Sequence, residues 1–282
     1  MIQQEKIWFI TGVSGGIGRS IAKQAALAGN TVIGTVRKEE QIEAFSALVP
    51  GKTYGVLLDV NEHAQVKGVV DAAILKFGRI DVLVNNAGYG LFGAVEEVSI
   101  AEARQQMETN FFGALAVTQA ILPIMRQQKS GHIVQISSQA GFRSAPGLGI
   151  YNASKFALEG FSEALALEVA PLNIKVTIVE PGPFRTSWAG DSSKRAENII
   201  DDYSGTAGKL ISTINGYSGN QPNDPEKGAK IILEVINSEN PPLRLPLGPE
   251  AHEAVKGKLK SVTEDIGVWE SRAIKTAFTD ED

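Results

Sequence analysis

A tyrosine and a lysine lie four residues apart in the run Tyr151-Asn152-Ala153-Ser154-Lys155. In an α-helix this spacing places both side chains on one face, one turn apart. An ordinary tyrosine has a pKa of about 10 and is a poor proton shuttle at neutral pH. A nearby ammonium group, together with an oxidised nicotinamide, lowers that pKa and suits the phenol to general acid–base work. Without further support, such a pair is more often an accident of an amphipathic surface.

Other polar residues support a site around this pair. Ser138 follows an apolar run at 132–136, thirteen residues before Tyr151, where its hydroxyl can bond a substrate carbonyl. The run Asn85-Asn86-Ala87-Gly88 ends another apolar segment and has no apolar role of its own. Asn110 interrupts a segment that otherwise favours a helix, and its neighbours Phe111 and Phe112 indicate burial. If the apolar runs are parallel strands, their carboxyl ends bring these residues to one crevice.

A glycine-rich turn lies near the start of the chain. Residues 11–18, Thr-Gly-Val-Ser-Gly-Gly-Ile-Gly, follow the first apolar run and open the first helical segment. Glycines permit a tight turn and a close approach of backbone N–H groups to a pyrophosphate, which the helix dipole also favours. A turn without a ligand is the alternative, but the position between strand and helix favours a nucleotide. The candidate cofactor contacts in this turn are Gly12, Ser14, Gly16, Ile17 and Gly18.

The second strand ends in a basic rather than an acidic residue. An enzyme that uses NAD places Asp or Glu about 20 residues after the glycines, at a position that Val36 occupies here. Arg37 follows, and its guanidinium suits the 2′-phosphate of NADP. The alternative is that Arg37 and Lys38 form the solvated start of a helix. The sequence therefore predicts NADP (NADPH) as the cofactor.

The elements that must position these residues alternate along the chain. Short apolar runs predict strands at 6–10, 31–36, 53–58, 81–84, 132–136, 175–179 and 243–247. Amphipathic segments predict helices at 17–28, 39–48, 62–77, 100–128, 151–169 and 225–237. This order predicts an α/β fold: a Rossmann-like, doubly wound parallel sheet of about seven strands with helices on both faces. We expect one domain over 1–282, with a substrate lid at 187–224 and a helical tail at 249–282.

Composition excludes several classes of protein. The 282 residues include 27 Lys and Arg against 32 Asp and Glu, a net charge of −5, which gives no reason to expect nucleic acid as a partner. There is no cysteine, so disulfides and thiolate chemistry are absent. The three histidines lie far apart, and no metal site is predicted. No signal peptide and no membrane-spanning run is recognised, so we expect a cytoplasmic protein without membrane contacts.

Taken together, the motifs resemble the short-chain dehydrogenase/reductase family, in its compact single-domain branch. They occur in the family's order over about residues 6–190, and the ordered set is much more specific than any one motif. The matching residues are Thr11-Gly12-x-x-x-Gly16-x-Gly18, Asp59-Val60, Asn85-Asn86-Ala87-Gly88, Asn110, Ser138, Tyr151-x-x-x-Lys155 and Pro181-Gly182.

The resemblance implies a role for each matching residue. Tyr151 would be the general acid/base, Lys155 would bind the nicotinamide ribose, and Ser138 would polarise the substrate carbonyl. Asn110 would hold a water molecule that relays protons. The further cofactor contacts would be Asp59 and Val60 at the adenine, Asn86, Ala87 and Gly88 at the adjacent ribose, and Pro181, Gly182 and Thr186 at the nicotinamide.

The implied activity is an NADP-dependent oxidoreductase that interconverts a carbonyl group and a secondary alcohol. An NAD-preferring dehydrogenase of the same family and a catalytically silent nucleotide-binding sensor are the alternatives. The resemblance also implies a homodimer or homotetramer. Apolar residues in the loops over the crevice predict a small apolar substrate. The alternatives are that these residues pack the lid against the sheet, and that Arg143 or Arg185 faces the pocket and binds an acidic group. These apolar residues are Leu91, Phe92, Phe142, Leu148, Phe184 and Trp188.

Overall fold

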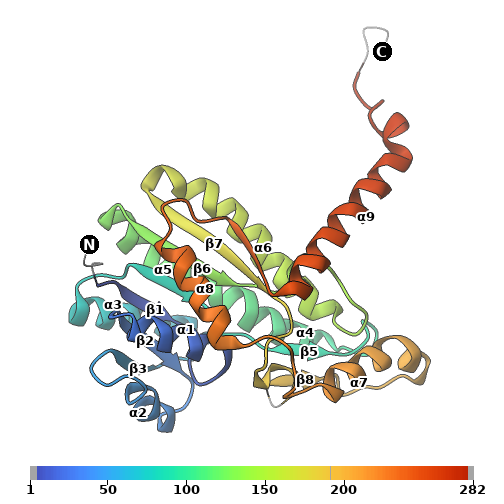
Figure 1. Cartoon of the computed structure of the whole chain (residues 1–282). Coiled ribbons are helices and arrows are strands. Elements are labelled where there is room, and N and C mark those ends of the chain that lie inside the picture. The colour runs from blue at the N-terminus through green and yellow to red at the C-terminus, as the bar shows by residue number, and fades with distance from the viewer. Residues whose placement is uncertain (1–4, 191, 279–282) are drawn as a thin grey trace.

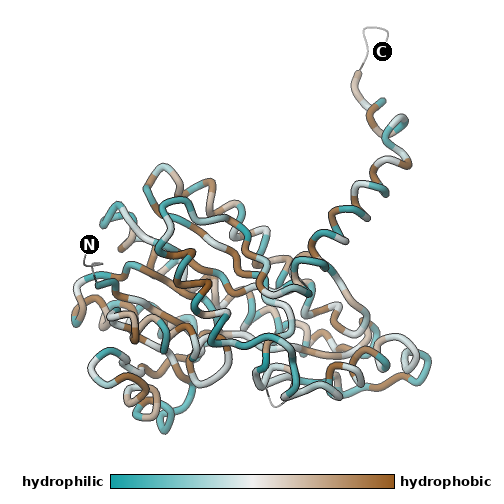
Figure 2. The backbone as a smooth tube through the Cα atoms, viewed as in Figure 1, coloured by the Kyte–Doolittle hydropathy of each residue, from teal (hydrophilic) through white to brown (hydrophobic). Residues whose placement is uncertain are grey.

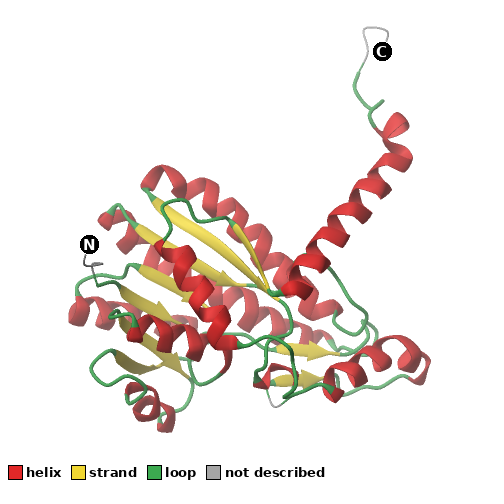
Figure 3. Cartoon of the chain, viewed as in Figure 1, coloured by secondary structure: helices red, strands yellow, loops and turns green. Residues whose placement is uncertain are grey.

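The computed structural model describes residues 5–190 and 192–278 and is built around one parallel sheet. Its seven strands lie in the order β3-β2-β1-β4-β6-β7-β9, and every pairing between them is parallel (Figure 3). The predicted Rossmann-like, doubly wound fold is confirmed. The strands are β1 (Ile7–Ile10), β2 (Thr31–Val36), β3 (Thr53–Leu57), β4 (Val82–Asn85), β6 (Gly131–Ile136), β7 (Ile174–Pro181) and β9 (Arg244–Leu247).

Helices cover both faces of this sheet (Figure 1). One core cluster joins the strands to α1, α2 and α8, and a second joins them to α3, α5 and α6. Successive strand residues alternate between the two: Trp8 and Ile10 belong to the first cluster and Phe9 to the second. The helices are α1 (Gly16–Leu27), α2 (Glu40–Ser46), α3 (His63–Phe77), α4 (Ile100–Met107), α5 (Gly113–Gln128), α6 (Gly149–Val169), α7 (Lys209–Gly216), α8 (Pro225–Asn237) and α9 (Pro249–Ala273).

Two segments differ from the prediction. The helix expected over 100–128 is interrupted by a π-helical turn, Glu108–Phe112, which separates α4 from α5. The region expected to be irregular contains α7 and a short strand, β8 (Ser193–Arg195), which pairs in parallel with β5 (Gly90–Phe92). These two strands were missed because three residues are too few to display a strand periodicity.

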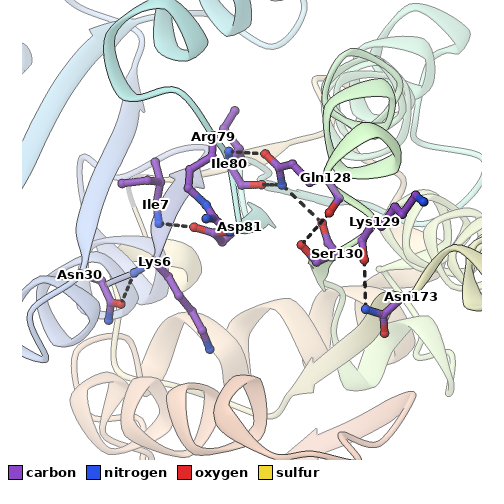
Figure 4. A network of polar contacts seen from close by, with 10 residues as sticks. All are labelled: Lys6, Ile7, Asn30, Arg79, Ile80, Asp81, Gln128, Lys129, Ser130 and Asn173. Carbon is purple, nitrogen blue, oxygen red and sulfur yellow. Dashed lines mark hydrogen bonds and ion pairs between the residues drawn. The ribbon is translucent and has the colours of Figure 1, made fainter. Parts of the chain in front are cut away.

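Side chains close the edge of the sheet where its strands begin (Figure 4). One carboxylate oxygen of Asp81 accepts from the backbone N–H of Ile7 at 2.8 Å, and the other from Nε of Arg79 at 2.8 Å. The Gln128 amide, at the end of α5, accepts from the N–H of Ile80 at 3.1 Å and donates to its carbonyl at 2.8 Å. Internal hydrogen bonds therefore hold this edge, and the opposite, carboxyl edge carries the predicted site.

Candidate active site

The predicted site residues gather at the carboxyl edge of the sheet. Strand order reverses between β1 and β4, since β2 and β3 lie on one side of β1 and the later strands lie beyond β4. Such a switch point opens a crevice for ligands in doubly wound sheets. The glycine-rich turn follows β1, Asn86 follows β4, Ser138 follows β6 and Gly182 follows β7. The topology thus brings together residues that are up to 170 positions apart in the chain.

Asn86 holds the glycine-rich turn in place. Its amide nitrogen donates to the carbonyls of Thr11 (2.9 Å) and Gly12 (2.8 Å). A Cβ atom on Gly18 would lie 2.2 Å from that nitrogen, so a larger residue would displace it. The Thr11 hydroxyl also accepts from the backbone N–H groups of Asn86 and Ala87 at 3.0 Å each. Asn86 thus has a structural task beside its predicted cofactor contact, and Thr11 is a supporting residue whose role we did not predict.

The start of α1 fits a pyrophosphate. Gly15 precedes the helix and offers no side-chain cap, and the first turn carries no acidic residue. No side chain of this turn therefore offsets the partial positive charge at the N-terminus of the helix. A Cβ on Gly15 would meet no atom within 4 Å. Gly12 and Gly16 have positive φ values of 72° and 59°, which favour glycine. Thr186 reaches this turn from the far end of the site: a Cβ on Gly16 would lie 3.6 Å from its Cγ2.

The predicted adenine end lies beside β2 and β3. Val36 is buried and Arg37 is exposed where β2 ends, which leaves the guanidinium accessible. Asp59 is half-buried after β3, and its carboxylate accepts from the N–H of Asn61 at 3.0 Å. Val60 is buried against α5, because a Cβ on Gly113 would lie 2.7 Å from its Cγ2. Arg37, Asp59 and Val60 therefore follow neighbouring strands at the same edge of the sheet.

Tyr151 and Lys155 lie on α6 and are both buried. The Lys155 ammonium donates to the Ile136 carbonyl at 2.8 Å and lies 6.0 Å from the centre of the Tyr151 ring. Burial lowers the pKa of Lys155 to about 8, against an opposing effect of Glu159. Burial raises the pKa of Tyr151 to about 12, and the Ser138 hydroxyl opposes that rise. In the chain alone, desolvation outweighs the Ser138 hydrogen bond. The lowering of the Tyr151 pKa that we predicted also requires an oxidised nicotinamide, so it stays a prediction.

Asn110 lies in the π-helical turn and is buried. Its amide nitrogen donates to the Tyr89 carbonyl and to the Ser154 hydroxyl, both at 3.0 Å, and its oxygen accepts from the N–H of Tyr89 at 3.0 Å. Ser154 in turn donates to the Tyr151 carbonyl at 2.7 Å. The Asn110 side chain thus joins the loop after β4 to the helix that carries Tyr151. Its predicted role as a water ligand stays a prediction.

A buried ionic cluster that the sequence did not reveal lies behind the catalytic helix. The Arg244 guanidinium, at the start of β9, contacts the carboxylates of Glu159 and Glu180, the latter at 3.0 Å. Glu159 lies one turn after Lys155 on α6, and Glu180 directly precedes Pro181. Burial raises the pKa of Glu159 to about 7. The partners are 64 and 85 residues from Arg244, so no local motif could have indicated their contact.

An apolar cluster packs around Tyr151. Trp188 lies 5.2 Å from the Tyr151 ring and 5.3 Å from Phe92, measured between ring centres. Leu148 and residues of α7, among them Ile214, complete the cluster. Phe92, Leu148 and Trp188 thus lie near Tyr151, at the predicted site.

Other expected lining residues lie elsewhere. The ring of Phe184 belongs to the main core, where a Cβ on Gly228 of α8 would lie 2.7 Å from it. Phe142 packs under the Arg244 guanidinium, 5.4 Å away. The side chain of Arg185 donates to the Gln221 carbonyl at 3.0 Å. Among residues 5–190 and 192–278 no group of three His, Asp or Glu side chains is placed to hold a metal, and no helix is long and apolar enough to cross a membrane.

The sequence comparisons all match this chain to dehydrogenases, reductases or proteins named as oxidoreductases. The model of the short chain dehydrogenase family matches residues 6–197. Oxidoreductase BOA17 of Botryotinia fuckeliana is 42% identical over 96% of this chain and 99% of its own length. A 3-ketodihydrosphingosine reductase of Bacteroides thetaiotaomicron is 39% identical over 87% of this chain and 89% of its own. Retinol dehydrogenase 8 of Bos taurus is 36% identical over 83% of this chain and 79% of its own length.

Solved structures agree with the sequences. A short-chain dehydrogenase from Streptomyces avermitilis superposes with a TM-score of 0.92 at 40% identity, over 98% of this chain and 100% of its own. A family member from Burkholderia phymatum in complex with NAD superposes with a TM-score of 0.81 at 25% identity, over 95% of this chain and 96% of its own. ElxO with NADP bound superposes with a TM-score of 0.71 at 27% identity, over 86% of this chain and 96% of its own. The chain therefore belongs to the short-chain dehydrogenase/reductase family and is an NAD(P)-dependent oxidoreductase.

Proposed function

We propose that this enzyme uses NADP(H) to interconvert a carbonyl group and a secondary alcohol on a small apolar substrate. The observation that carries the proposal is a buried tyrosine, Tyr151, with Ser138 and Lys155 beside it and an apolar cluster over its ring. A proton donor at this position serves carbonyl reduction, and an apolar surround favours a substrate without charges.

The choice of NADP rests on charge at the end of β2. Arg37 is exposed there and no acidic residue occupies the preceding position, which is the buried Val36. A guanidinium binds a phosphate through paired, charge-assisted hydrogen bonds, whereas an acidic residue would repel it. The start of α1 and the glycine-rich turn would hold the pyrophosphate.

The chain's own residues would position the reactants and move the proton. The bound nicotinamide supplies the hydride for reduction or accepts it in oxidation. Tyr151 would donate its phenolic proton to the substrate oxygen, and Ser138 would hold that oxygen by a hydrogen bond. Lys155, whose ammonium already donates to the Ile136 carbonyl, would bind the ribose. A phenol with a raised pKa holds its proton at neutral pH, which suits a proton donor in the reductive direction.

The rest of the molecule fits this assignment. We propose that residues 1–282 act as one domain, that 187–224 form a lid over the substrate, and that copies of the chain associate as a homodimer or homotetramer. Trp188 and α7, both within the proposed lid, pack on the apolar cluster around Tyr151. Two relatives are named as a 3-ketodihydrosphingosine reductase and a retinol dehydrogenase, which supports a carbonyl or alcohol group as the reacting group here.

The test is turnover of NADPH with a panel of aliphatic and aromatic aldehydes and ketones, and of NADP with the matching alcohols. Tyr151→Phe should lower kcat/KM for the best substrate by about 10²- to 10⁴-fold, as expected for loss of a general acid. Binding of NADPH, followed by its fluorescence, should persist in this variant.

Tyr217→Phe is the matched control, because Tyr217 packs against the same apolar cluster. It should retain activity within a factor of about three. Undiminished turnover in Tyr151→Phe would refute the assigned chemistry. If the protein binds NADPH but turns over none of the carbonyl compounds or alcohols, it is a catalytically silent nucleotide sensor instead.

A further inference from the structure

The final helix, α9, carries an apolar face that is exposed over most of its length in the described chain. Its first turns bury Ala251 and Ala254 against the body, and the helix then projects away (Figure 1). Every residue from 259 to 278 is exposed. Large apolar side chains are among them: Leu259 is 53% exposed, Ile266 62% and Trp269 60%. Figure 2 shows hydrophobic and hydrophilic segments alternating along this projecting helix.

The apolar residues of this face have the spacing of a coiled coil. They alternate in steps of four and three residues over about three heptads, which keeps them along one seam of the helix. We call this set the α9 stripe; it consists of Val255, Leu259, Val262, Ile266, Trp269 and Ala273. A helix is stabilised mainly by packing its apolar face, so this stripe calls for a partner.

The charges beside the stripe identify the partner. At the positions that flank the stripe, the half of the helix near the body carries Lys256 and Lys258, and the outer half carries Asp265, Glu270 and Arg272, so the two halves have opposite net charge. Two copies of α9 running antiparallel would place the basic half of each over the acidic half of the other. A parallel pair would place lysines beside lysines and acids beside acids, which is unfavourable. An antiparallel pair also keeps the two protein bodies at opposite ends of the paired helices.

We propose that the α9 stripe is a self-association surface that pairs antiparallel with the α9 stripe of a second copy of this chain. Such a pair is isologous, with a two-fold axis near Val262. Residues near the axis then meet their own counterparts, whereas Val255 lies about 10 Å along the helix from the axis and about 20 Å from its counterpart. This difference distinguishes the antiparallel pair from a parallel one.

Single cysteines test the geometry in the full chain, because the natural sequence contains none and an introduced thiol is unique. With a short bismaleimide, Val262→Cys should crosslink to a covalent dimer at least tenfold more than Val255→Cys. Ser261→Cys lies at the level of the axis but off the stripe, and it should crosslink no better than Val255→Cys. Efficient crosslinking of both Val262→Cys and Val255→Cys would indicate a parallel pair and overturn the proposal, as would no crosslinking of Val262→Cys.

The mass of the particle, measured by sedimentation velocity, gives an independent test. Ile266→Asp should halve the mass, while Val268→Asp should leave it unchanged, because Val268 is 75% exposed on the same helix but off the stripe. Neither variant should change turnover, since the stripe does not touch the active site. An equal mass for wild type and Ile266→Asp would refute self-association through the stripe. A monomeric wild type that sediments with phosphatidylcholine–phosphatidylglycerol vesicles would assign the stripe to a lipid surface instead.

Discussion

In the proposed function, the preference for NADP would depend on a single side chain, Arg37. It follows β2 with its guanidinium exposed, beside the buried Val36. Hydrogen bonds to a charged group contribute about 1.5–3 kcal/mol, which corresponds to roughly 10- to 150-fold in affinity. Arg37→Ala should therefore raise KM for NADPH by about 10- to 100-fold and change KM for NADH by less than about threefold. Steady-state kinetics with both cofactors at a fixed substrate concentration measure this ratio.

Lys38→Ala is the control for Arg37→Ala. Lys38 is also exposed and forms a long ion pair with Glu40, at 3.8 Å, so its loss should affect both cofactors weakly and alike. A wild-type enzyme that prefers NADH, or an Arg37→Ala variant that loses both cofactors equally, would contradict the NADP assignment. In that case Arg37 would be only a solvated residue of the turn between β2 and α2.

At the scale of elements, Arg244 links three segments that carry the site. Its strand β9 is thereby joined to α6 through Glu159 and to β7 through Glu180. The pKa of Glu159 is raised to about 7 by burial, so the folded protein keeps this proton to a higher pH than the unfolded chain does. Protonation of Glu159 therefore contributes its full stabilisation of the fold below about pH 4.5, and this contribution is lost as the pH rises through about 7.

Glu159→Gln removes this titration while keeping the shape of the side chain. The free energy of unfolding of Glu159→Gln minus that of wild type should be higher at pH 8 than at pH 5 by about 1–3 kcal/mol, because only the wild type loses stability over this range. Urea unfolding at the two pH values measures the difference. Glu163→Gln removes the more exposed ion pair of the same Arg244, at 2.9 Å, and should shift stability by less than about 1 kcal/mol. Parallel pH dependences for wild type and Glu159→Gln would show that Glu159 does not titrate in this range.

The elements also show where sequence reasoning succeeds. Apolar runs and helical periodicity predicted the seven sheet strands and most of the helices, since burial on one or two faces leaves a clear pattern. Periodicity did not reveal the π-helical turn at Asn110, because one extra residue in a helix barely alters the pattern. It also missed the Arg244 cluster, since that cluster depends on which strands become neighbours. The motifs predicted site residues that the fold brings to one edge of the sheet, but the pKa of Tyr151 also depends on burial that only the fold determines.

At the scale of the whole molecule, the chain returns over the proposed catalytic residues. After β7 the segment 187–224 leaves the sheet, adds β8 beside β5, and brings Trp188 and α7 to the Tyr151 cluster. It then leads to α8, which covers the opposite face of the sheet from α6. The proposed lid therefore begins after β7 and ends at α8, which packs on the sheet, and its apolar side chains would form part of the substrate's surroundings.

This arrangement predicts that Trp188 selects for apolar substrates. Trp188→Ala removes an aromatic ring that lies 5.2 Å from Tyr151 and 5.3 Å from Phe92, so an aromatic ketone loses contact area that acetone never uses. With acetophenone kcat/KM should fall by about 10- to 100-fold, and with acetone by less than about threefold. Ile199→Ala, in the same segment but 80% exposed, should leave both substrates unaffected. An equal loss for both ketones would mean that Trp188 only packs the lid against the sheet, because a structural defect at Tyr151 would slow every substrate alike.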